Sequence, residues 1–375
     1  ALRNSLIPLG EHGRIETALR EAERIAGALG DRQRIGQVAA YVSAHFLWTG
    51  DYDRALESGE RALALTEGLG TSALRVQAMF RLGQVHHARG EYRPAVEFLA
   101  RNVAELTGDL LYQPFGLPYH PSVSSRSWSA WCLGELGEFT HALARGEEAV
   151  QLAEAVDHAY SRVIASVGAG VAHVTRGEFP AAISVLERGL RLCEGGSFPL
   201  WFPEIARALG GAFLLSGRVD DALALLDEAV RQAAAMKLVF GHARRIADLA
   251  DAHRLAGRLD VATTLAEEAL RLSQVHRERG SEAWALRLLG EIASHRDRRR
   301  VEEAESRYRE ARALASELGM RPLVAHCHLG LGRLYRQAGN RPEWREQLGT
   351  AAALYRDLGM SLWVSQAQPP PEKDS

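Results

Sequence analysis

Histidine and cysteine are the residue types here that could bind a metal or act as a nucleophile, and their spacing argues against both roles. The histidines cluster only at His86-His87 and at His326-Cys327-His328. Side chains one or two positions apart on a helix point to different faces, so we expect neither cluster to bind a metal. Cys132, Cys193 and Cys327 lie far apart and form no CxxC pair, which indicates reduced thiols rather than a zinc module or a disulfide framework.

Lysines and short sequence motifs also point away from catalysis. The chain holds two lysines, Lys237 and Lys373, which are followed by Leu238 and Asp374. A Walker A loop needs a lysine followed by serine or threonine, so we expect no nucleotide hydrolysis. The sequence contains no HExxH, no GxSxG and no complete GxGxxG motif. We therefore predict that the protein is not an enzyme and binds no cofactor and no metal.

Composition excludes further classes of partner. The formal net charge is −2 over 375 residues, which gives no general attraction to nucleic acid or to an anionic membrane. No stretch approaches the roughly 18 apolar residues of a membrane span, and the N-terminus lacks the apolar core of a signal peptide. The predicted location is the cytoplasm, and the codon bias implied by abundant arginine, alanine and glycine indicates a bacterial source.

The sequence contains an internal repeat, and this repeated unit must position any binding site. Glycine, an acidic residue and an aromatic residue recur at Gly50-Asp51-Tyr52, Gly90-Glu91-Tyr92, Gly137-Glu138-Phe139 and Gly177-Glu178-Phe179, at intervals of about 40 residues. Glycine alone marks further copies at Gly13, Gly217, Gly257 and Gly339. Five positions after most of these glycines stands an alanine: Ala18, Ala55, Ala95, Ala142, Ala182, Ala222 and Ala262. The pattern predicts a helix, a tight turn at glycine, and a second helix that packs closely on the first.

The helix ends carry their own signals. Many predicted second helices finish at Leu-Gly pairs, namely Leu29-Gly30, Leu69-Gly70, Leu318-Gly319 and Leu358-Gly359. Glycine there is a plausible C-cap. No segment shows sustained period-two alternation with β-branched residues, so we predict an all-α fold.

Paired helices with this turn and this alanine spacing resemble tetratricopeptide repeats, and Leu82-Gly83 and Leu209-Gly210 supply the family's Leu-Gly pair. The resemblance implies a right-handed superhelical solenoid of about nine helix-turn-helix repeats, with a period near 40 residues instead of about 34. The eighth turn, Asp297-Arg298-Arg299-Arg300, lacks its glycine, although Ala304 and Ala311 keep the register. We predict one continuous array over residues 1–365, a proline-containing insertion at about 107–125, and a disordered tail at 366–375.

A narrower resemblance concerns several longer segments, and it spans nearly the whole chain. They are Phe115-Gly116-Leu117-Pro118, Ser125-Arg126-Ser127-Trp128, residues 282–293, residues 320–332 and Tyr355-Arg356-Asp357-Leu358-Gly359-Met360. These segments resemble the C-terminal repeat region of bacterial proteins that join an adenylate/guanylate cyclase-like domain to an AAA- or STAND-type ATPase. The resemblance implies a regulatory arm, and the start at Ala1 with a short first helix leads us to expect upstream domains. It carries over no cyclase or ATPase residues.

In such arrays the first helices line the concave face, so their exposed residues are the candidate ligand contacts. Counting back from each turn glycine selects amide and aromatic residues in the N-terminal half and mostly arginines in the C-terminal half. The candidates are Gln77, Phe80, Gln84, His87, Trp131, Arg207, Arg244, Asp251, Arg254, Arg333 and Arg336. An arginine cluster suits a carboxylate, a phosphate or an acidic peptide. Arginines on helices are also often solvated or paired with nearby acids, and both readings stay open.

The insertion offers a second candidate region. Tyr112 to Pro121 contains three prolines, which disfavour a helix. Phe115, Leu117 and Tyr119 are rich in apolar surface for a plain linker. They either cover neighbouring helices or form a lip of the binding groove or a domain contact.

Two functions follow as hypotheses. The first is a non-catalytic scaffold that binds a protein or peptide, including the upstream domains of its own chain, and thereby regulates an attached ATPase or cyclase. The alternative is a sensor of a small anionic molecule that controls the same attached domain. The sequence does not indicate the oligomeric state.

Overall fold

The protein is built of helices that pair as antiparallel hairpins. The computed structural model describes residues 5–67, 73–195, 198–296 and 301–368, and these residues form helices without a strand. Eight complete hairpins are preceded by η1 (Ile7–Leu9) and α2 (His12–Leu29) and followed by α19 (Ser361–Gln366). The hairpins are α3 (Arg32–Thr49) with α4 (Tyr52–Ala64), α5 (Ala73–Ala88) with α6 (Tyr92–Glu105), α7 (Pro121–Leu136) with α8 (Phe139–Ala155), α9 (Ala159–Arg176) with α10 (Phe179–Gly195), α11 (Phe202–Leu215) with α12 (Val219–Ala235), α13 (His242–Leu255) with α14 (Leu259–His276), α15 (Arg279–Arg296) with α16 (Val301–Glu317), and α17 (Arg321–Gln337) with α18 (Arg341–Asp357). The all-α prediction is confirmed.

The predicted glycine corners are confirmed at seven positions. The backbone angle φ is +82° at Gly50, +81° at Gly90 and +83° at Gly217, a left-handed conformation that only glycine adopts without strain. The remaining corners with positive φ are Gly137, Gly177, Gly257 and Gly339. The predicted C-caps Gly30, Gly319 and Gly359 are also left-handed. Gly70 and the turn at 297–300 lie outside the described residues.

The first corner was assigned wrongly. Gly13 lies inside α2, whereas Gly10, with φ of +66°, turns the chain before that helix. The interval from Gly10 to the left-handed Gly30 equals that from Gly339 to Gly359, so Gly10 sets the register. Ile15, which is 2% exposed, therefore takes the position predicted for Ala18.

Small residues allow the paired helices to approach each other. The alanines five positions after the other corners, Ala55, Ala95, Ala142, Ala182, Ala222 and Ala262, are all fully buried. In the Leu-Gly pair the small residue is on the first helix of the hairpin instead of the second. The glycine there leaves room for a large side chain from the second helix. A Cβ atom added to Gly210 would lie 2.7 Å from Cγ of Leu226, and one added to Gly83 would lie 2.7 Å from Cγ of Leu99. These contacts hold the two helices of a hairpin together.

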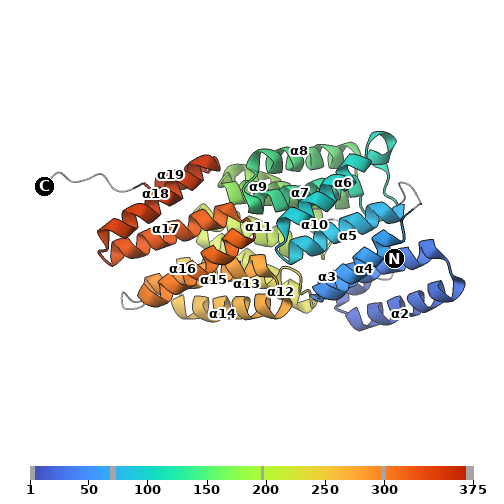
Figure 1. The fold of residues 1–375 in the computed structure, drawn as a ribbon, viewed down its shortest axis with the longest axis horizontal. Coiled ribbons are helices and arrows are strands. Elements are labelled where there is room, and N and C mark those ends of the chain that lie inside the picture. Colours follow the sequence, from blue (N-terminus) through green and yellow to red (C-terminus); the bar gives the residue numbers. More distant parts are fainter. Residues whose placement is uncertain (1–4, 68–72, 196–197, 297–300, 369–375) are drawn as a thin grey trace.

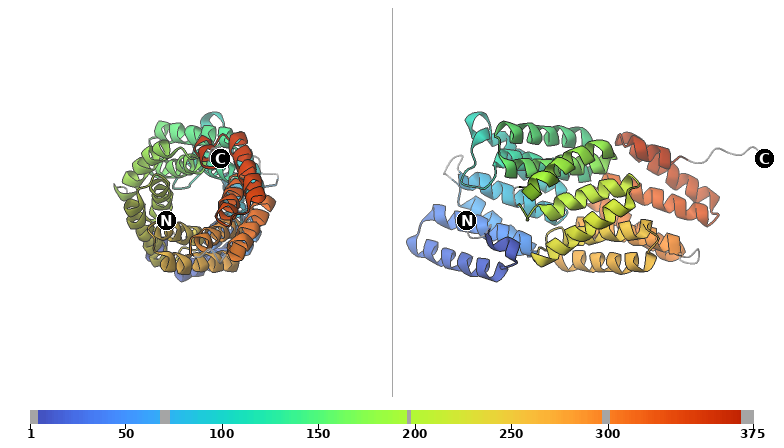
Figure 2. Two further views of the ribbon diagram at one scale, coloured as in Figure 1. Left: turned by 90° about the vertical axis from the view of Figure 1, so that its left-hand side faces the viewer. Right: turned by 180° about the vertical axis from the view of Figure 1, so that it is seen from behind.

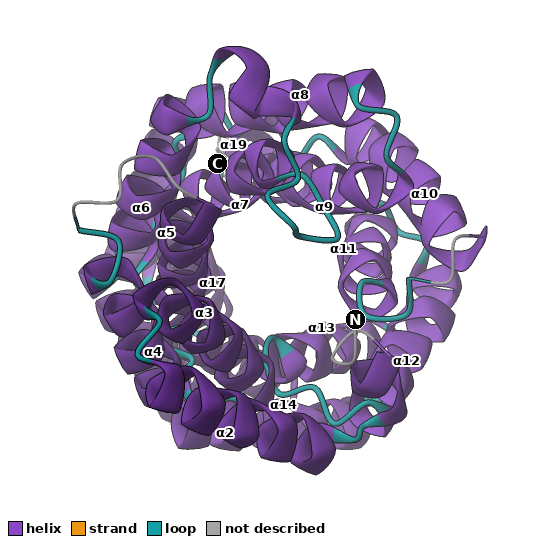
Figure 3. Ribbon diagram, turned by 90° about the vertical axis from the view of Figure 1, so that its right-hand side faces the viewer, coloured by secondary structure: helices purple, strands orange, loops and turns teal. Residues whose placement is uncertain are grey.

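The solenoid coils into a tube whose successive turns touch. First helices line the inside of the tube and second helices form its outside (Figures 1, 2 and 3). Trp48 accepts a hydrogen bond of 2.9 Å at its carbonyl from the backbone nitrogen of Val239. The Tyr52 hydroxyl donates to Glu278 at 2.5 Å. The superhelix therefore completes one turn in about 190 residues and rests on itself.

Corner glycines of the first turn meet the second turn. Cβ atoms added to Gly50, Gly90, Gly137 and Gly177 would clash or nearly clash with Val239, Gly280, Leu358 and Trp363, respectively. Added Cβ atoms at Gly217, Gly257 and Gly339 would meet nothing within 4 Å. We call the first set of contacts the inter-turn seam. Its four glycines are needed both for the turn and for the close approach of the second superhelical turn.

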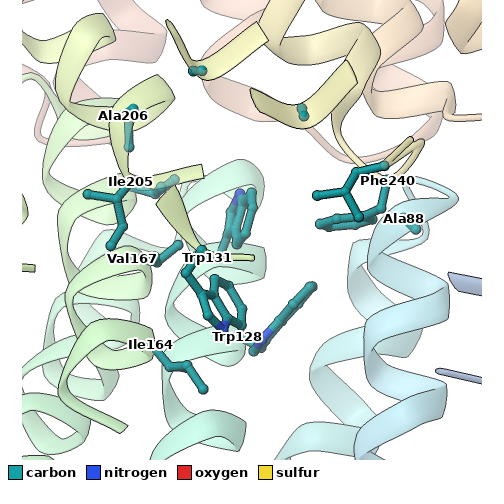
Figure 4. Packing of buried hydrophobic residues seen from close by; sticks show 14 of the residues in the cluster. Ala88, Trp128, Trp131, Ile164, Val167, Ile205, Ala206 and Phe240 are labelled. Carbon is teal, nitrogen blue, oxygen red and sulfur yellow. The ribbon is translucent and has the colours of Figure 1, made fainter. Parts of the chain in front are cut away.

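An aromatic cluster fills the tube beside this seam. Phe240, on the loop between α12 and α13, lies 5.4 Å from Trp48, 5.6 Å from Trp128 and 6.4 Å from Trp131 between ring centroids. Figure 4 shows Phe240 facing the two tryptophans of α7. His87 packs 4.5 Å from the Trp131 ring and lies 3.3 Å from the Cys132 sulfur through Nδ1. The first superhelical turn is therefore plugged by side chains at this level.

The insertion after α6 folds back onto the array. It contains the 3-10 helix η2 (Gly108–Tyr112), and α7 begins at Pro121, so residues 121–125 of the predicted insertion are helical. Proline is well tolerated at the first position of a helix, where its missing N–H has no partner to lose.

None of the helices in the described ranges is long and apolar enough to span a membrane.

The inter-turn seam predicts a difference between two corner glycines of nearly equal φ. Gly90→Ala and Gly217→Ala share the backbone penalty of roughly 1–2 kcal/mol. At Gly90 the added Cβ would also lie 2.7 Å from the backbone nitrogen of Gly280, which cannot move aside cheaply. We expect Gly90→Ala to lower the free energy of unfolding by about 1–3 kcal/mol more than Gly217→Ala, as measured by urea denaturation. Equal losses would contradict the seam.

Burial of His87 predicts acid sensitivity. Burial, with a smaller contribution from Arg207, lowers the pKa of His87 from 6.5 to about 3. The unfolded chain therefore binds the extra proton between these values, so the stability present above pH 6.5 is lost as the pH falls. At pH 5 this one group destabilises the fold by about 2 kcal/mol. We expect His87→Phe to reduce by that amount the difference in unfolding free energy between pH 7 and pH 5, as measured by urea denaturation at the two pH values.

Candidate ligand-binding cleft

The tube opens into a cleft of ≈ 440 Å³ on the concave face of the second superhelical turn. Side chains from α11, α13, α15, α17 and α19 form its walls, and the end of α9 and the start of α10 close one side. Five arginines and three carboxylates line it: Arg207, Arg244, Arg254, Arg287, Arg333, Asp248, Asp251 and Glu291. The predicted residues Arg207, Arg244, Asp251, Arg254 and Arg333 thus come together. We call this space the concave cleft.

Arg207 links the cleft to the interior. It donates to Glu204 at 2.6 Å and to Asp248 at 2.9 Å, and its side chain is only 8% exposed. Burial alone lowers the pKa of this guanidinium, but the carboxylates of Glu204 and Asp248 outweigh burial and raise it. Arg207 is therefore a fixed positive charge held by two acids.

Three further ion pairs continue around the wall. Arg244 donates to Asp248 at 3.0 Å, Arg254 to Asp251 at 2.7 Å, and Arg287 to Glu291 at 3.2 Å. Partners three or four residues apart on one helix face the same way, so α13 presents two of these pairs and α15 presents one. Burial raises the pKa of Glu291, but Arg287, Arg254 and Arg333 outweigh it and hold that pKa below its usual value. The cleft wall is thus a band of alternating fixed charges.

Aromatic side chains supply the apolar part of the surface. The guanidinium carbons of Arg244 and Arg287 lie 4.1 Å and 5.4 Å from the centroid of Trp284, distances suited to cation–π attraction. The Trp284 indole N–H donates to Glu135 at 3.3 Å. His326 packs against Trp363 of α19 with centroids 4.6 Å apart, and burial, followed by the nearby arginines, holds its pKa well below the usual range. His326 is therefore neutral at physiological pH.

The two arginines of α17 that the sequence selected, Arg333 and Arg336, differ in position. Arg333 lines the cleft and donates from Nη2 to the Gln366 side-chain oxygen at 3.0 Å. Arg336 is exposed and is not among the residues that line the cleft.

The amide and aromatic candidates of the N-terminal half lie in the core. Gln77, Phe80, Gln84, His87 and Trp131 are at most 7% exposed. Gln77 donates to the Phe115 carbonyl at 3.0 Å, and Gln84 accepts from Arg81 at 2.6 Å. The insertion contacts Gln77 and Phe80, whose ring lies 5.7 Å from that of Tyr119 between centroids. The aromatic plug around Phe240 covers His87 and Trp131.

The insertion residues also serve packing. Leu117 and Tyr119 are 7% and 5% exposed, and Phe115 is half-buried. The Tyr119 hydroxyl accepts a hydrogen bond of 2.7 Å from Arg81, and its ring stacks on Tyr160. These contacts support the first of the two readings, in which the loop covers neighbouring helices.

Sequence reasoning missed the contribution of α15 to the cleft. Trp284, Arg287 and Glu291 were not selected because the corner after α15 falls at 297–300, where no glycine anchors the count. Ala304, which keeps the register of the next helix, could have supplied the anchor. Asp248 and His326 were also missed, although both lie on first helices with an identified corner.

Two other features bear on the choice of site. A cavity of ≈ 570 Å³ lies between α8, α9 and α10, and it is lined by four apolar and five polar or charged side chains: Val150, Ala153, Ala165, Leu192, Glu154, Ser166, Arg162, Arg188 and Arg191. It brings together no residue selected from the sequence. Among the described residues no group of three or more histidine, cysteine, aspartate or glutamate side chains could hold a metal ion.

Comparison with known proteins places the fold. Residues 35–101 match the family model described as "Tetratricopeptide repeat". No curated protein sequence matches the chain.

Solved structures cover almost the whole length of the chain. The Rap conjugation gene regulator of plasmid pLS20, solved in complex with the Phr* peptide, is 12% identical with a TM-score of 0.60 over 97% of this chain and 98% of that chain. A Rap protein complexed with Competence and Sporulation Factor is 12% identical with a TM-score of 0.59 over 88% of this chain and 95% of that chain. The apo quorum sensor NprR from B. thuringiensis is 13% identical with a TM-score of 0.54 over 92% and 94%. The chain therefore has the fold of a tetratricopeptide-like helical repeat solenoid.

Proposed function

We propose that the protein is a non-catalytic scaffold that binds a short peptide or a protein segment in the concave cleft. One observation carries the proposal: the first helices α11, α13 and α15 bring ion-paired arginines and carboxylates together with Trp284 around a single space on the inner face of the tube. A surface of alternating fixed charges and aromatic rings offers partners to a peptide backbone, to charged side chains and to apolar side chains at once. The cleft residues Arg207, Arg244, Asp251, Arg254 and Arg333 are the proposed contacts.

Two of the structures with this fold were solved with a bound peptide or signalling factor, namely the pLS20 Rap regulator with Phr* and the Rap protein with Competence and Sporulation Factor. Identities of 12% extend to the fold and not to individual contacts. The two complexes support a peptide as the class of ligand for a solenoid of this fold.

The cleft chemistry favours binding over catalysis. Arg207, Arg244, Arg254 and Arg287 are each within ion-pair distance of a carboxylate. The carboxylate partners fix these guanidinium groups in position and use part of their hydrogen-bonding capacity. The cleft is therefore preorganised, which suits the binding of a ligand. We therefore propose no catalytic residue.

The biological setting of the scaffold rests on the sequence resemblance to cyclase- and ATPase-associated repeats. We propose that residues 1–365 form one continuous array, and that this array is the regulatory arm of a bacterial signalling ATPase or cyclase. Cys132, Cys193 and Cys327 are free and buried, which agrees with a reducing compartment such as the cytoplasm.

A small anionic molecule is the second candidate ligand. The volume of ≈ 440 Å³ falls within the roughly 300–1,000 Å³ of small-molecule sites. A thermal-shift screen separates the two, because a metabolite at 100 times its dissociation constant stabilises the fold by about 2.7 kcal/mol. A library of metabolites that leaves the melting temperature unchanged would count against this candidate.

Filling the cleft tests the proposed site with a matched control. Gly211 lines the cleft and Gly349 lies on α18 outside it, and a Cβ atom added at either position meets nothing within 4 Å. We expect Gly211→Trp to weaken at least tenfold the binding of peptides selected from a displayed random library. Gly349→Trp should bind as the wild type does, as measured by isothermal titration calorimetry.

Both substitutions replace a glycine in a helix interior, so circular dichroism should show that each variant keeps its fold. Selection of no peptide by the wild type, or equal binding by the two variants, would remove the cleft from consideration as the peptide site.

A further inference from the structure

Arg333 differs from the other arginines of the concave cleft. Arg207, Arg244, Arg254 and Arg287 each make an ion pair at 3.3 Å or less. Arg333 has no carboxylate within ion-pair distance among the described residues, and its hydrogen-bond partner is the neutral side-chain amide of Gln366. Its guanidinium thus lies in the cleft without a direct counter-charge.

The cleft as a whole also carries an excess of positive charge. Five arginines face three carboxylates among its lining residues. Glu204, behind Arg207, pairs with both Arg207 and Arg245 and so compensates charge below the surface. The uncompensated positive charge in the cleft is therefore concentrated toward Arg333.

Gln366, the partner of Arg333, is the last residue of α19. This helix follows α18 directly and lies beside α17 at the C-terminal end of the tube (Figure 1). Trp363 of the same helix packs on His326, and Leu362 faces the cleft with 39% of its surface exposed. A short helix therefore holds a neutral acceptor on Arg333, in the place that an acidic group of a ligand could take.

We propose that the cleft selects ligands with a carboxylate, and that this carboxylate binds Arg333 by displacing the amide oxygen of Gln366. The inference rests on the proposed peptide-binding function and names the ligand as an acidic peptide. A guanidinium binds a carboxylate through two parallel N–H···O bonds, which are shorter and stronger than a bond to a neutral amide. Arg333 is then the residue that determines specificity, and Gln366 is its internal, weaker competitor.

The proposal is tested with an array of hexapeptides in matched sets that differ only in one glutamate-to-glutamine exchange or in a free against an amidated C-terminus. The wild type should prefer the carboxylate-bearing member of a set at least tenfold, and the two kinds of set show whether a side chain or the C-terminus supplies it. Arg333→Gln should abolish this preference, since a bond to a charged group is worth about tenfold or more in affinity. Arg336→Gln, one helical turn further on and outside the cleft, should retain it.

Substitution of Gln366 gives the complementary result. Gln366→Glu is nearly isosteric and places a carboxylate of the chain itself on Arg333, so it should weaken binding of the acidic peptides at least tenfold. Gln366→Ala removes the competitor and should leave that binding unchanged or strengthen it. Circular dichroism and the melting temperature of each variant establish that the fold is retained.

The possible failures are distinguishable. Peptides that bind the wild type without preference for the carboxylate, or a preference that survives Arg333→Gln, would overturn the assignment of Arg333 and leave peptide binding intact. Equal binding by Gln366→Glu and the wild type would do the same for the displacement of Gln366. An array in which no peptide binds the wild type would overturn the proposed function itself.

Discussion

The close contact between successive turns of the superhelix is the constraint on which the rest of the structure depends. Gly50, Gly90 and Gly137 meet the second turn where any side chain would clash, and Gly177 meets it where a side chain would fit only tightly. An open solenoid presents one long groove, because each repeat touches only its neighbours. Here the contact compresses the superhelix into a tube, so residues about 190 positions apart share one core. Phe240 packs on Trp48 across this contact and also lies against Trp128 and Trp131. The cleft begins where that plug ends.

The inter-turn seam also explains why so many charged side chains are buried without being isolated. Glu278 accepts from Tyr52 and from the backbone of Gly241, and Arg245 pairs with Glu204 and donates to the Phe240 carbonyl. Burial raises the pKa of Glu278 and lowers that of Arg245, so burial opposes both charges. Breaking such a group away from its partners is more destabilising than the pair is stabilising. The seam is thus specified by polar contacts as well as by shape.

The local features of the fold could be predicted from the sequence, and the long-range ones could not. A corner such as Gly217 and a buried position such as Ala222 depend on neighbours within one hairpin, so spacing alone identifies them. The stacking of turns depends on small rotations between repeats that add up over five hairpins, and no residue type signals that sum. His87 was therefore predicted to line an open groove, and Phe240 of the second turn closes the tube there. Arg207 and Arg254 lie beyond the plug and line the concave cleft.

Self-pairing of the cleft arginines bears on what the cleft can recognise. An ion pair such as Arg254 with Asp251 is already desolvated on both sides, so a ligand that competes for either partner must replace an interaction as strong as the one it offers. The paired groups therefore contribute complementarity and exclude ligands whose charges do not match, more than they contribute affinity. Arg333 is different because its present partner is neutral. A carboxylate gains more at Arg333 than it would at the four paired arginines, so one residue at the edge of a surface whose other arginines are paired can decide which ligands bind.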